Sequence, residues 1–419
     1  MSKKTISFLI FLTFLIIYYA SSFSKISFGD CIGFVLDVER REFLTDFMPL
    51  THFLYINFAV FFSKFLNIDS VLVMRLMSVV PAALTVSAIF ILIKEFVKEN
   101  WIAVASSFVF GFGFTFWRSA ATVEVYAFNA IWVILFLVCS IKSLRNKSEK
   151  AIILAGVFLG LSLWVHIQNI MLIPAYIYLL YLLRSERRGI ILSLIFFASL
   201  FFVMFLVNHL QGIDAKYVFT SKKGRWVQST FEQSLLDHLK NMMKAIAFLI
   251  YNFNVFILFS VGGVIHLYKN FKTEAVFLFI AAAFTLGFAT FYAVSDNYVY
   301  FIPFYLVFAV FIAVGIKKLN MKFSIRRLRF APVLIPFFYV CCLWIVSLLP
   351  HSKDFQNKKA YKGGLHYYML PWLHNNIGCI EFTLDNGTAT DNVEALKEWS
   401  NEFIKMRKEY QTLEAIRKL

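Results

Sequence analysis

The sequence predicts an all-α polytopic membrane protein, and three observations lead to this prediction. Hydrophobic residues make up 60% of the 419 residues, 51 of them Phe, and the mean hydropathy is +0.70. A chain of this composition is too apolar for a water-soluble domain. Its apolar runs are continuous over about 17 to 25 residues, the length at which a helix crosses a bilayer. Finally, the lysines and arginines gather in the short segments between these runs.

About eleven of the apolar runs are long enough to be transmembrane helices. They are expected at residues 6–24, 71–93, 101–117, 125–141, 151–166, 170–183, 190–208, 245–266, 275–294, 298–316 and 330–350.

A further apolar segment, Pro49 to Leu66, is shorter and contains His52 and Lys64. If it lies on the outer membrane surface, the N-terminus and the loops at 94–100, 142–150, 184–188, 269–272 and 317–329 all face the cytoplasm. These segments hold 19 Lys and Arg residues, which is the asymmetry of the positive-inside rule. Counting the segment as a span would place the basic loops outside. We therefore expect an interfacial helix on the outer face after the first span.

The formal charge of +16 is explained mostly by these inner loops and their contact with anionic lipid, so nothing indicates a nucleic-acid partner. The first apolar segment is expected to remain as a membrane anchor with a cytoplasmic N-terminus. The Lys-, Ile- and Phe-rich composition favours a prokaryotic plasma membrane.

The chain is expected to divide into a membrane domain, residues 1–350, and an extracytoplasmic tail, residues 351–419. In the tail, Asp391 and Glu394 have the spacing of a capping box. Apolar residues then recur at steps of three and four from Leu396 to Leu413, which predicts an amphipathic helix packed on the protein, on the membrane or on a second copy. Cys31 and Cys379 both fall outside the spans, and a disulfide between them is one alternative.

Candidate catalytic residues lie in an acidic first loop between Gly29 and Asp46. It contains Asp30, Asp37 and Glu39 among its carboxylates, with only Arg40 and Arg41 to balance them. Ionisable groups near the membrane are costly, and each is therefore a hypothesis for function. The further candidates at the outer ends of spans or in outer loops are His52, Arg75, Arg118, Glu124, His166, Lys222, Lys223 and Arg225.

Each of these candidates also has a structural interpretation. Arg75 is either a snorkelling side chain or a partner for an anion. Arg118 and Glu124 are close enough in sequence to form a local ion pair, and a single histidine such as His166 is more often an interface residue than a catalyst. The basic cluster at Lys222, Lys223 and Arg225 either holds a phosphate headgroup or is a solvated loop. No HExxH or CxxC spacing indicates a metal site. The acidic loop leaves a divalent metal as an alternative that we do not favour.

The order of several short motifs resembles the GT-C superfamily of polyprenyl-phosphate-dependent glycosyltransferases. Within this superfamily, the motifs resemble a branch long described as a membrane domain of unknown function. That branch includes the animal transmembrane protein O-mannosyltransferases. The resemblance covers roughly residues 5 to 320. It rests on Phe28-Gly29-Asp30-Cys31, Pro49 with His52-Phe53-Leu54-Tyr55, Arg75-Leu76, Glu124-Val125-Tyr126-Ala127, Trp164-Val165-His166 with Ile173-Pro174-Ala175, and Asp296-Asn297-Tyr298-Val299-Tyr300-Phe301-Ile302-Pro303.

The resemblance implies transfer of a sugar on the outer face, from a polyprenyl-phosphate donor to a hydroxyl of a protein, lipid or glycan, with inversion. It places the family's first-loop aspartate, the general base, at Asp30. Arg75 and the basic cluster would then neutralise the leaving phosphate, while Glu124 and His166 would line the pocket. The family often has a glutamate three residues after its aspartate, where this chain has Gly33. Either Asp37 or Glu39 supplies that carboxylate, or the acceptor differs, or activity is lost.

Two other classes of function remain open. A lipid or glycan transporter would need ionisable groups deep in the spans and, often, internal repeats. No repeat is evident here, and the charges lie at the outer ends. A non-catalytic subunit of a glycan-assembly complex is the third alternative, suggested by the tail helix and by Gly33.

Overall fold

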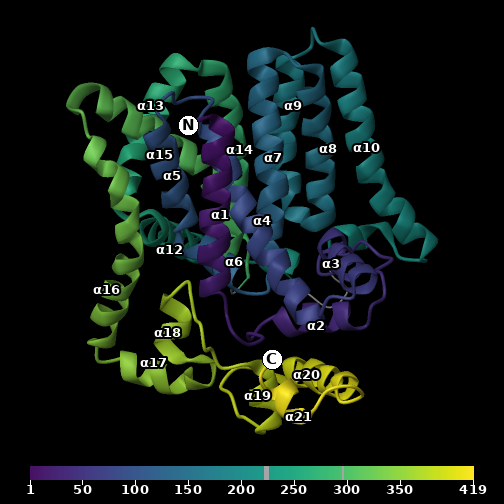
Figure 1. The fold of residues 1–419 in the computed structure, drawn as a ribbon. Coiled ribbons are helices and arrows are strands. Elements are labelled where there is room, and N and C mark those ends of the chain that lie inside the picture. Colours follow the sequence, from purple (N-terminus) through teal and green to yellow (C-terminus); the bar gives the residue numbers. More distant parts are fainter. Residues whose placement is uncertain (221–225, 295–296) are drawn as a thin grey trace.

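The computed structural model describes residues 1–220, 226–294 and 297–419, and every regular element in these ranges is a helix. Figure 1 shows a bundle of long helices with the N-terminus at one end and a tail of short helices, with the C-terminus, at the other. The elements of the bundle are α1 (Lys3–Ser21), α4 (Ser70–Ile93), α5 (Asn100–Gly111), α6 (Phe114–Ala121), α7 (Val125–Asn146), α8 (Glu149–Val165), η1 (Ile167–Leu172), α9 (Ile173–Leu182), α10 (Arg187–Leu210), α12 (Leu235–Phe253), η3 (Asn254–Phe256), α13 (Ile257–Asn270), α14 (Lys272–Phe291), η4 (Asn297–Phe301), α15 (Ile302–Phe323), η5 (Arg326–Leu334) and α16 (Ile335–Ser347). The connections between them contain α2 (Cys31–Glu39), α3 (Phe53–Leu66), η2 (Ala215–Val218) and α11 (Trp226–Phe231), and the tail contains α17 (Ser352–Lys358), η6 (Ala360–Lys362), α18 (Gly364–Met369), α19 (Cys379–Leu384), α20 (Glu394–Arg407) and α21 (Leu413–Arg417).

The all-α membrane fold is confirmed, whereas the count of about eleven spans stays a prediction. Among the described residues, 8 helical stretches are long and apolar enough to cross a membrane, or 9 if α5 and α6 form one span bent by 65°. The expected spans at 151–166 and 170–183 fall on α8, which has 17 residues, and on the shorter apolar stretch Ile167–Leu182.

Helix α3 has the properties of the expected interfacial helix. Its 14 residues extend about 21 Å, less than the roughly 30 Å of a hydrocarbon core. One face is buried through Leu54, Tyr55 and Ile56, while Phe61 and Phe65 on the other face are exposed.

The basic loops gather at the end of the bundle that holds the N-terminus. The Lys3 ammonium pairs with Glu95 at 3.1 Å, and Arg145 Nε lies 3.3 Å from Glu274 Oε1. The Lys317 ammonium donates to the carbonyl of Phe96 at 2.9 Å. The tail lies at the opposite end (Figure 1), so the bundle has one basic end and one end covered by the tail.

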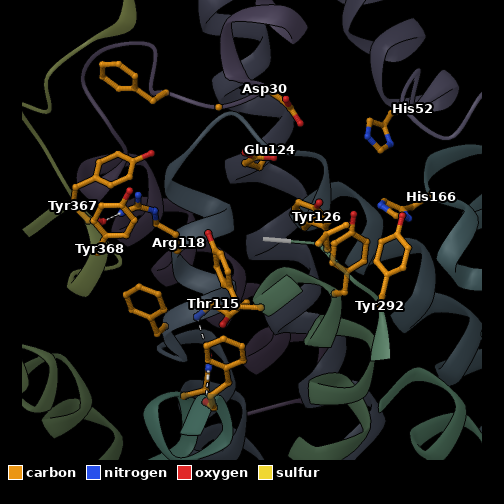
Figure 2. Close-up of a pocket in the computed structure, with 18 of the residues that line it drawn as sticks. Asp30, His52, Thr115, Arg118, Glu124, Tyr126, His166, Tyr292, Tyr367 and Tyr368 are labelled. Carbon is orange, nitrogen blue, oxygen red and sulfur yellow. Dashed lines mark hydrogen bonds between the residues drawn. The ribbon is translucent and has the colours of Figure 1, made fainter. Parts of the chain in front are cut away.

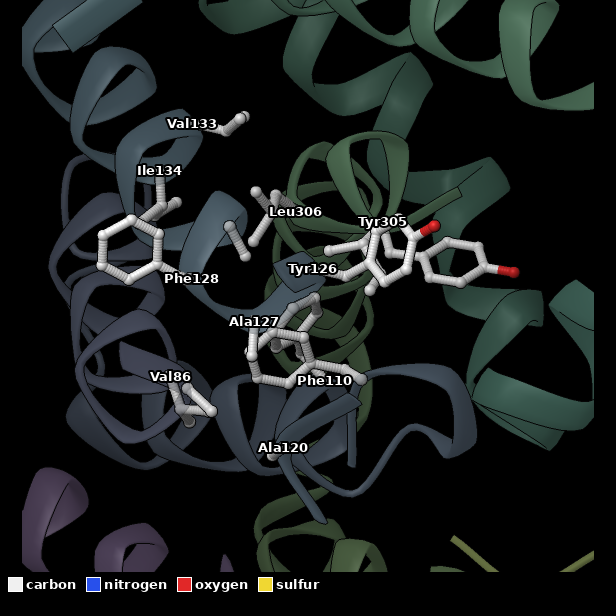
Figure 3. Packing of buried hydrophobic residues seen from close by; sticks show 14 of the residues in the cluster. Val86, Phe110, Ala120, Tyr126, Ala127, Phe128, Val133, Ile134, Tyr305 and Leu306 are labelled. Atoms are coloured by element: carbon white, nitrogen blue, oxygen red, sulfur yellow. The ribbon is translucent and has the colours of Figure 1, made fainter. Parts of the chain in front are cut away.

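The core of the bundle forms where α4, α5, α6, α7 and α15 meet, as Figure 3 shows. Helix α15 is buried without interruption from Ile302 to Ile316. It packs closely on α13, because a Cβ built on Gly263 would lie 1.8 Å from the Phe311 carbonyl oxygen, and one on Gly315 would lie 1.8 Å from that of Phe259. Any residue other than glycine at these two positions would push the helices apart.

The tail is held against the first loop by a buried cluster of charges. Helix α20 packs on α2 and α19. Arg407, 1% exposed, donates from Nη2 to Glu39 at 2.7 Å and to Ser70 Oγ at 2.8 Å, and from Nη1 to Asp69 at 2.6 Å. The amphipathic segment therefore packs on the protein itself.

Two details of the tail differ from the sequence predictions. The capping box does not form: Asn392 Oδ1 accepts from Glu394 N at 3.1 Å, while Asp391 binds lysines instead. Cys31 and Cys379 are both buried free thiols, so the disulfide alternative is wrong for this structure.

Candidate functional site

A cavity of about 950 Å³ opens at the tail-covered end of the bundle. Its walls come from segments far apart in the sequence: the loop before α2, the start of α3, helix α6, the starts of α7 and η1, the ends of α12 and α14, and the tail. Among the residues singled out from the sequence, this cavity brings together Asp30, His52, Arg118, Glu124 and His166.

Two carboxylates stand in the middle of the cavity, and Figure 2 shows Asp30 above Glu124. Asp30 is the residue before α2 and Glu124 the residue before α7. Gly29, with φ of 100°, adopts a backbone conformation that favours glycine and turns the chain into α2 at Asp30. The Asp30 side chain makes no capping bond to its helix, and burial raises the pKa of its carboxyl.

A buried guanidinium forms one side of the cavity. Arg118 is 7% exposed and stacks on the rings of Phe23 and Tyr367, with centroids 4.6 and 4.2 Å from its Cζ. Its Nη1 donates to the carbonyls of Tyr367 at 2.6 Å and Leu370 at 3.2 Å. Within residues 1–220, 226–294 and 297–419 no carboxylate lies within salt-bridge distance of it. Arg118 therefore brings a positive charge into the cavity, and the carbonyls and rings that it contacts are neutral.

The tail adds two ammonium groups to the cavity. Lys359 and Lys362 both line the cavity and both pair with Asp391, the second at 3.3 Å. Tyr361 also donates to this carboxylate. Hydrogen bonds from Lys359 and Tyr361 lower the pKa of Asp391. Two cations share one anion here, so this group has a net positive charge.

Aromatic rings line the side of the cavity opposite Arg118 (Figure 2). The ring of His166 lies 5.3 Å from that of His52, 5.7 Å from Tyr126 and 5.4 Å from Tyr300, measured between centroids. His52 Nδ1 lies 3.0 Å from the carbonyl of Val165, so it carries the proton and donates. Burial lowers the pKa of His52 to about 4, and the imidazole is neutral at pH 7.

Asp37 and Glu39 do not line the cavity. Along α2 they lie about 10 and 13 Å beyond Asp30, at 1.5 Å per residue. Asp37 pairs with Arg40 at 3.0 Å, and Glu39 belongs to the Arg407 cluster. Position 33 is covered by the tail: a Cβ on Gly33 would lie 3.3 Å from the Trp399 ring. The cavity places Glu124 and, from the tail, Asp391 with Asp30, and neither carboxylate comes from α2.

Arg75 also lies away from the cavity. It joins α4 to α1, where Nε donates to Ser22 Oγ at 2.6 Å and Nη2 to the carbonyl of Tyr19 at 2.9 Å. Lys222, Lys223 and Arg225 lie outside the described residues. No group of three or more His, Cys, Asp or Glu residues suited to a metal ion occurs in the described part of the chain.

Comparison with solved structures gives the fold a name. The whole chain superposes on the crystal structure of ArnT from Cupriavidus metallidurans in the apo state, with a TM-score of 0.57 over 77% of that chain at 12% identity. The form of ArnT bound to undecaprenyl phosphate gives 0.57, covering 98% of this chain and 76% of that one at 10% identity. The chain has the GT-C fold.

Other comparisons cover parts of the chain. Residues 49–189 match the family model of the protein O-mannosyl-transferase TMEM260 N-terminal domain. The Archaeoglobus fulgidus oligosaccharyltransferase in complex with Zn and sulfate gives a TM-score of 0.48 at 13% identity over 85% of this chain. This chain spans 56% of the length of that structure. A search of curated proteins found no match.

Sequence reasoning missed the tail residues of this cavity. Lys359, Lys362, Tyr367 and Tyr368 follow no motif, and their role depends on the tail folding back across the bundle. One signal was available: residues 358–362 place three lysines and a tyrosine shortly after the last apolar run, which ends at residue 350.

Proposed function

We propose that this protein is an integral membrane glycosyltransferase that moves a sugar from a polyprenyl phosphate to an acceptor hydroxyl, with inversion at the anomeric carbon. The observation that carries the proposal is the cavity that is lined by the Asp30 and Glu124 carboxylates and by the guanidinium of Arg118. The GT-C fold and the match of residues 49–189 to a protein O-mannosyl-transferase family support the reaction class. They also favour mannose as the sugar and a protein hydroxyl as the acceptor.

The chemistry follows from the charges in the cavity. As the acceptor oxygen attacks the anomeric carbon, its proton passes to the Asp30 carboxylate, the general base. The bond between that carbon and the phosphate oxygen breaks on the opposite face of the sugar, and the oxygen leaves with the electron pair. Arg118, with Lys359 and Lys362, stabilises the negative charge on the departing polyprenyl phosphate. That ArnT was solved with undecaprenyl phosphate supports a lipid phosphate as the donor.

The neutral aromatic side is suited to a sugar or an acceptor. Tyr126, Tyr300 and the two histidines line this side with ring faces and neutral polar groups. Glu124 lies between the two sides and is placed to bind sugar hydroxyls. The basic loops lie at the other end of the bundle, so the positive-inside rule supports an extracytoplasmic position for this cavity.

The test is transfer from radiolabelled polyprenyl-phosphate sugars into cell-envelope acceptors by membranes that contain the protein. Asp30→Asn removes the base, and Asp37→Asn is its matched control, since it makes the same change within α2, outside the cavity. We expect transfer by the unchanged protein and by Asp37→Asn, and loss of about 100-fold or more with Asp30→Asn at equal amounts of folded protein. Equal transfer by both variants would remove Asp30 from the role of base.

A further inference from the structure

A second cavity, of about 500 Å³, lies between α16, α17 and α18. Figure 1 shows α16 at the edge of the bundle, with α17 and α18 at its tail-covered end. Helix α18 separates the two cavities, because Tyr367 and Tyr368 line the first, while Leu365 and His366 line the second. The second cavity is therefore a separate site that shares one wall with the first.

The two walls of this second cavity differ in polarity. Helix α16 supplies an apolar wall through Val340, Leu343 and Trp344, while the tail supplies Lys353, Gln356 and His366. No acidic side chain lines it. Lys353 is exposed and forms no salt bridge with any residue that the structure describes. Gln356 Oε1 accepts from Leu365 N at 2.8 Å, which leaves its amide nitrogen to donate. The polar wall thus offers positive charge and donors.

The position of the cavity places it at the membrane surface. Helix α16 belongs to one of the stretches long and apolar enough to span, Arg326–Ser347, which starts at the basic end of the bundle. Phe337 and Trp344 on it are 63% and 64% exposed, as expected of side chains that face lipid. Trp344 lies one turn before the end of the helix, and tryptophan prefers the boundary between hydrocarbon and headgroups. The apolar wall therefore faces acyl chains, while Lys353 lies at headgroup level.

We propose that this cavity binds an anionic glycerophospholipid, with its phosphate held by Lys353 and Gln356 and an acyl chain along Val340, Leu343 and Trp344. An unpaired ammonium beside an amide donor suits a phosphate. The apolar wall suits a chain that stays in the bilayer. This site is separate from the proposed glycosyl transfer and does not depend on it.

The test measures lipid binding by the full-length protein purified in detergent. Thermal stabilisation is followed as phosphatidylglycerol or phosphatidylcholine is added. Lys353→Glu reverses the charge in the cavity. Its matched control is Lys358→Glu, which changes an exposed lysine of the same helix that does not line the cavity. We expect phosphatidylglycerol to stabilise the unchanged protein and the control alike, and its apparent affinity to fall about tenfold in Lys353→Glu.

A second variant tests the cavity by shape. Val340 is 48% exposed, so Val340→Trp can be accommodated without disturbing the core, and it should fill the apolar end and weaken binding. All variants must elute as the same folded species in size exclusion. Equal effects of the two lipids, or equal binding by the two lysine variants, would overturn the proposal. So would binding of polyprenyl phosphate here in preference to phosphatidylglycerol.

Discussion

Replacing Arg407 by methionine should release the tail from the first loop. In the folded protein its guanidinium makes hydrogen bonds of 2.6 to 2.8 Å to Asp69, Glu39 and Ser70. The side chain of Glu39 is 8% exposed and that of Asp69 is 40% exposed. Methionine fills much of the same volume but leaves the buried Glu39 carboxylate without its counter-ion.

The expected cost follows from these exposures. Breaking a buried ion pair costs about 3 to 5 kcal/mol, because one charge is left desolvated. The Asp69 contact adds little, since water screens a carboxylate as exposed as this one. Glu39 also keeps Ser70 and Tyr410 as donors, so the lower end, about 3 kcal/mol, is expected. Because 1.4 kcal/mol is a factor of ten, tail opening should become about a hundredfold more frequent.

Thiol alkylation measures this opening directly. Cys379 begins α19 and is fully buried, so a maleimide reaches it only when the tail opens. In a background where the other four cysteines are serine, we expect alkylation about a hundredfold faster with Arg407→Met. The exposed neighbour Lys408, changed to Met, should leave the rate unchanged. Adding Glu39→Gln to Arg407→Met should slow alkylation again, because the unpaired charge is gone. The reasoning fails if Arg407→Met changes the rate less than threefold, or if the double variant reacts as fast as the single one.

Three further predictions concern the proposed site. Burial raises the pKa of Asp30, and a base must be deprotonated, so kcat/KM should fall with decreasing pH through a pKa above that of an ordinary aspartate; a pH profile with an unshifted acidic limb would contradict this. Changing both Lys359 and Lys362 to Met should lower transfer by about 10- to 100-fold with folding retained, whereas activity equal to the unchanged protein would exclude the tail from phosphate binding. Gly33→Glu should not supply a second catalytic carboxylate but should displace Trp399, loosen the tail and speed alkylation of Cys379. An unchanged alkylation rate would contradict this, because the Trp399 ring would then have moved aside without opening the tail.

Much of the fold could be predicted because lipid imposes a simple rule on sequence. A span must be a continuous apolar run, and each expected run lies on helices of the bundle. The sequence did not indicate where an apolar run bends, or where the helix that it forms is shorter than a full membrane span. Residues 101–117 form one apolar run, yet they divide at Phe112 and Gly113 into α5 and α6. The hydropathy of the sequence does not reveal such a break in a helix.

Part of the candidate site could be predicted from the sequence for the same reason. Asp30, Arg118, Glu124 and His166 each lie close to an end of an apolar run, and alternate ends of spans meet on one side of a membrane. Glu39 was chosen for its charge alone, but its position along α2 takes it to the tail instead. Lys359 and Lys362 reach the cavity only because the tail folds back across the bundle. The segment that contains them has no apolar run or periodicity from which this packing could be predicted.

The bend between α5 and α6 bears on how the chain is made. It is stabilised from outside: Asn252, in α12, accepts from the backbone N–H of Thr115 at 2.8 Å. During synthesis, the apolar run at 101–117 enters the membrane well before Asn252 exists. Within lipid, backbone groups exposed at a bend have no other partner, so the run is expected to insert as one straight helix first. Arg118 would then reach its final place only after α12 has been synthesised, which makes completion of the cavity a late event in assembly.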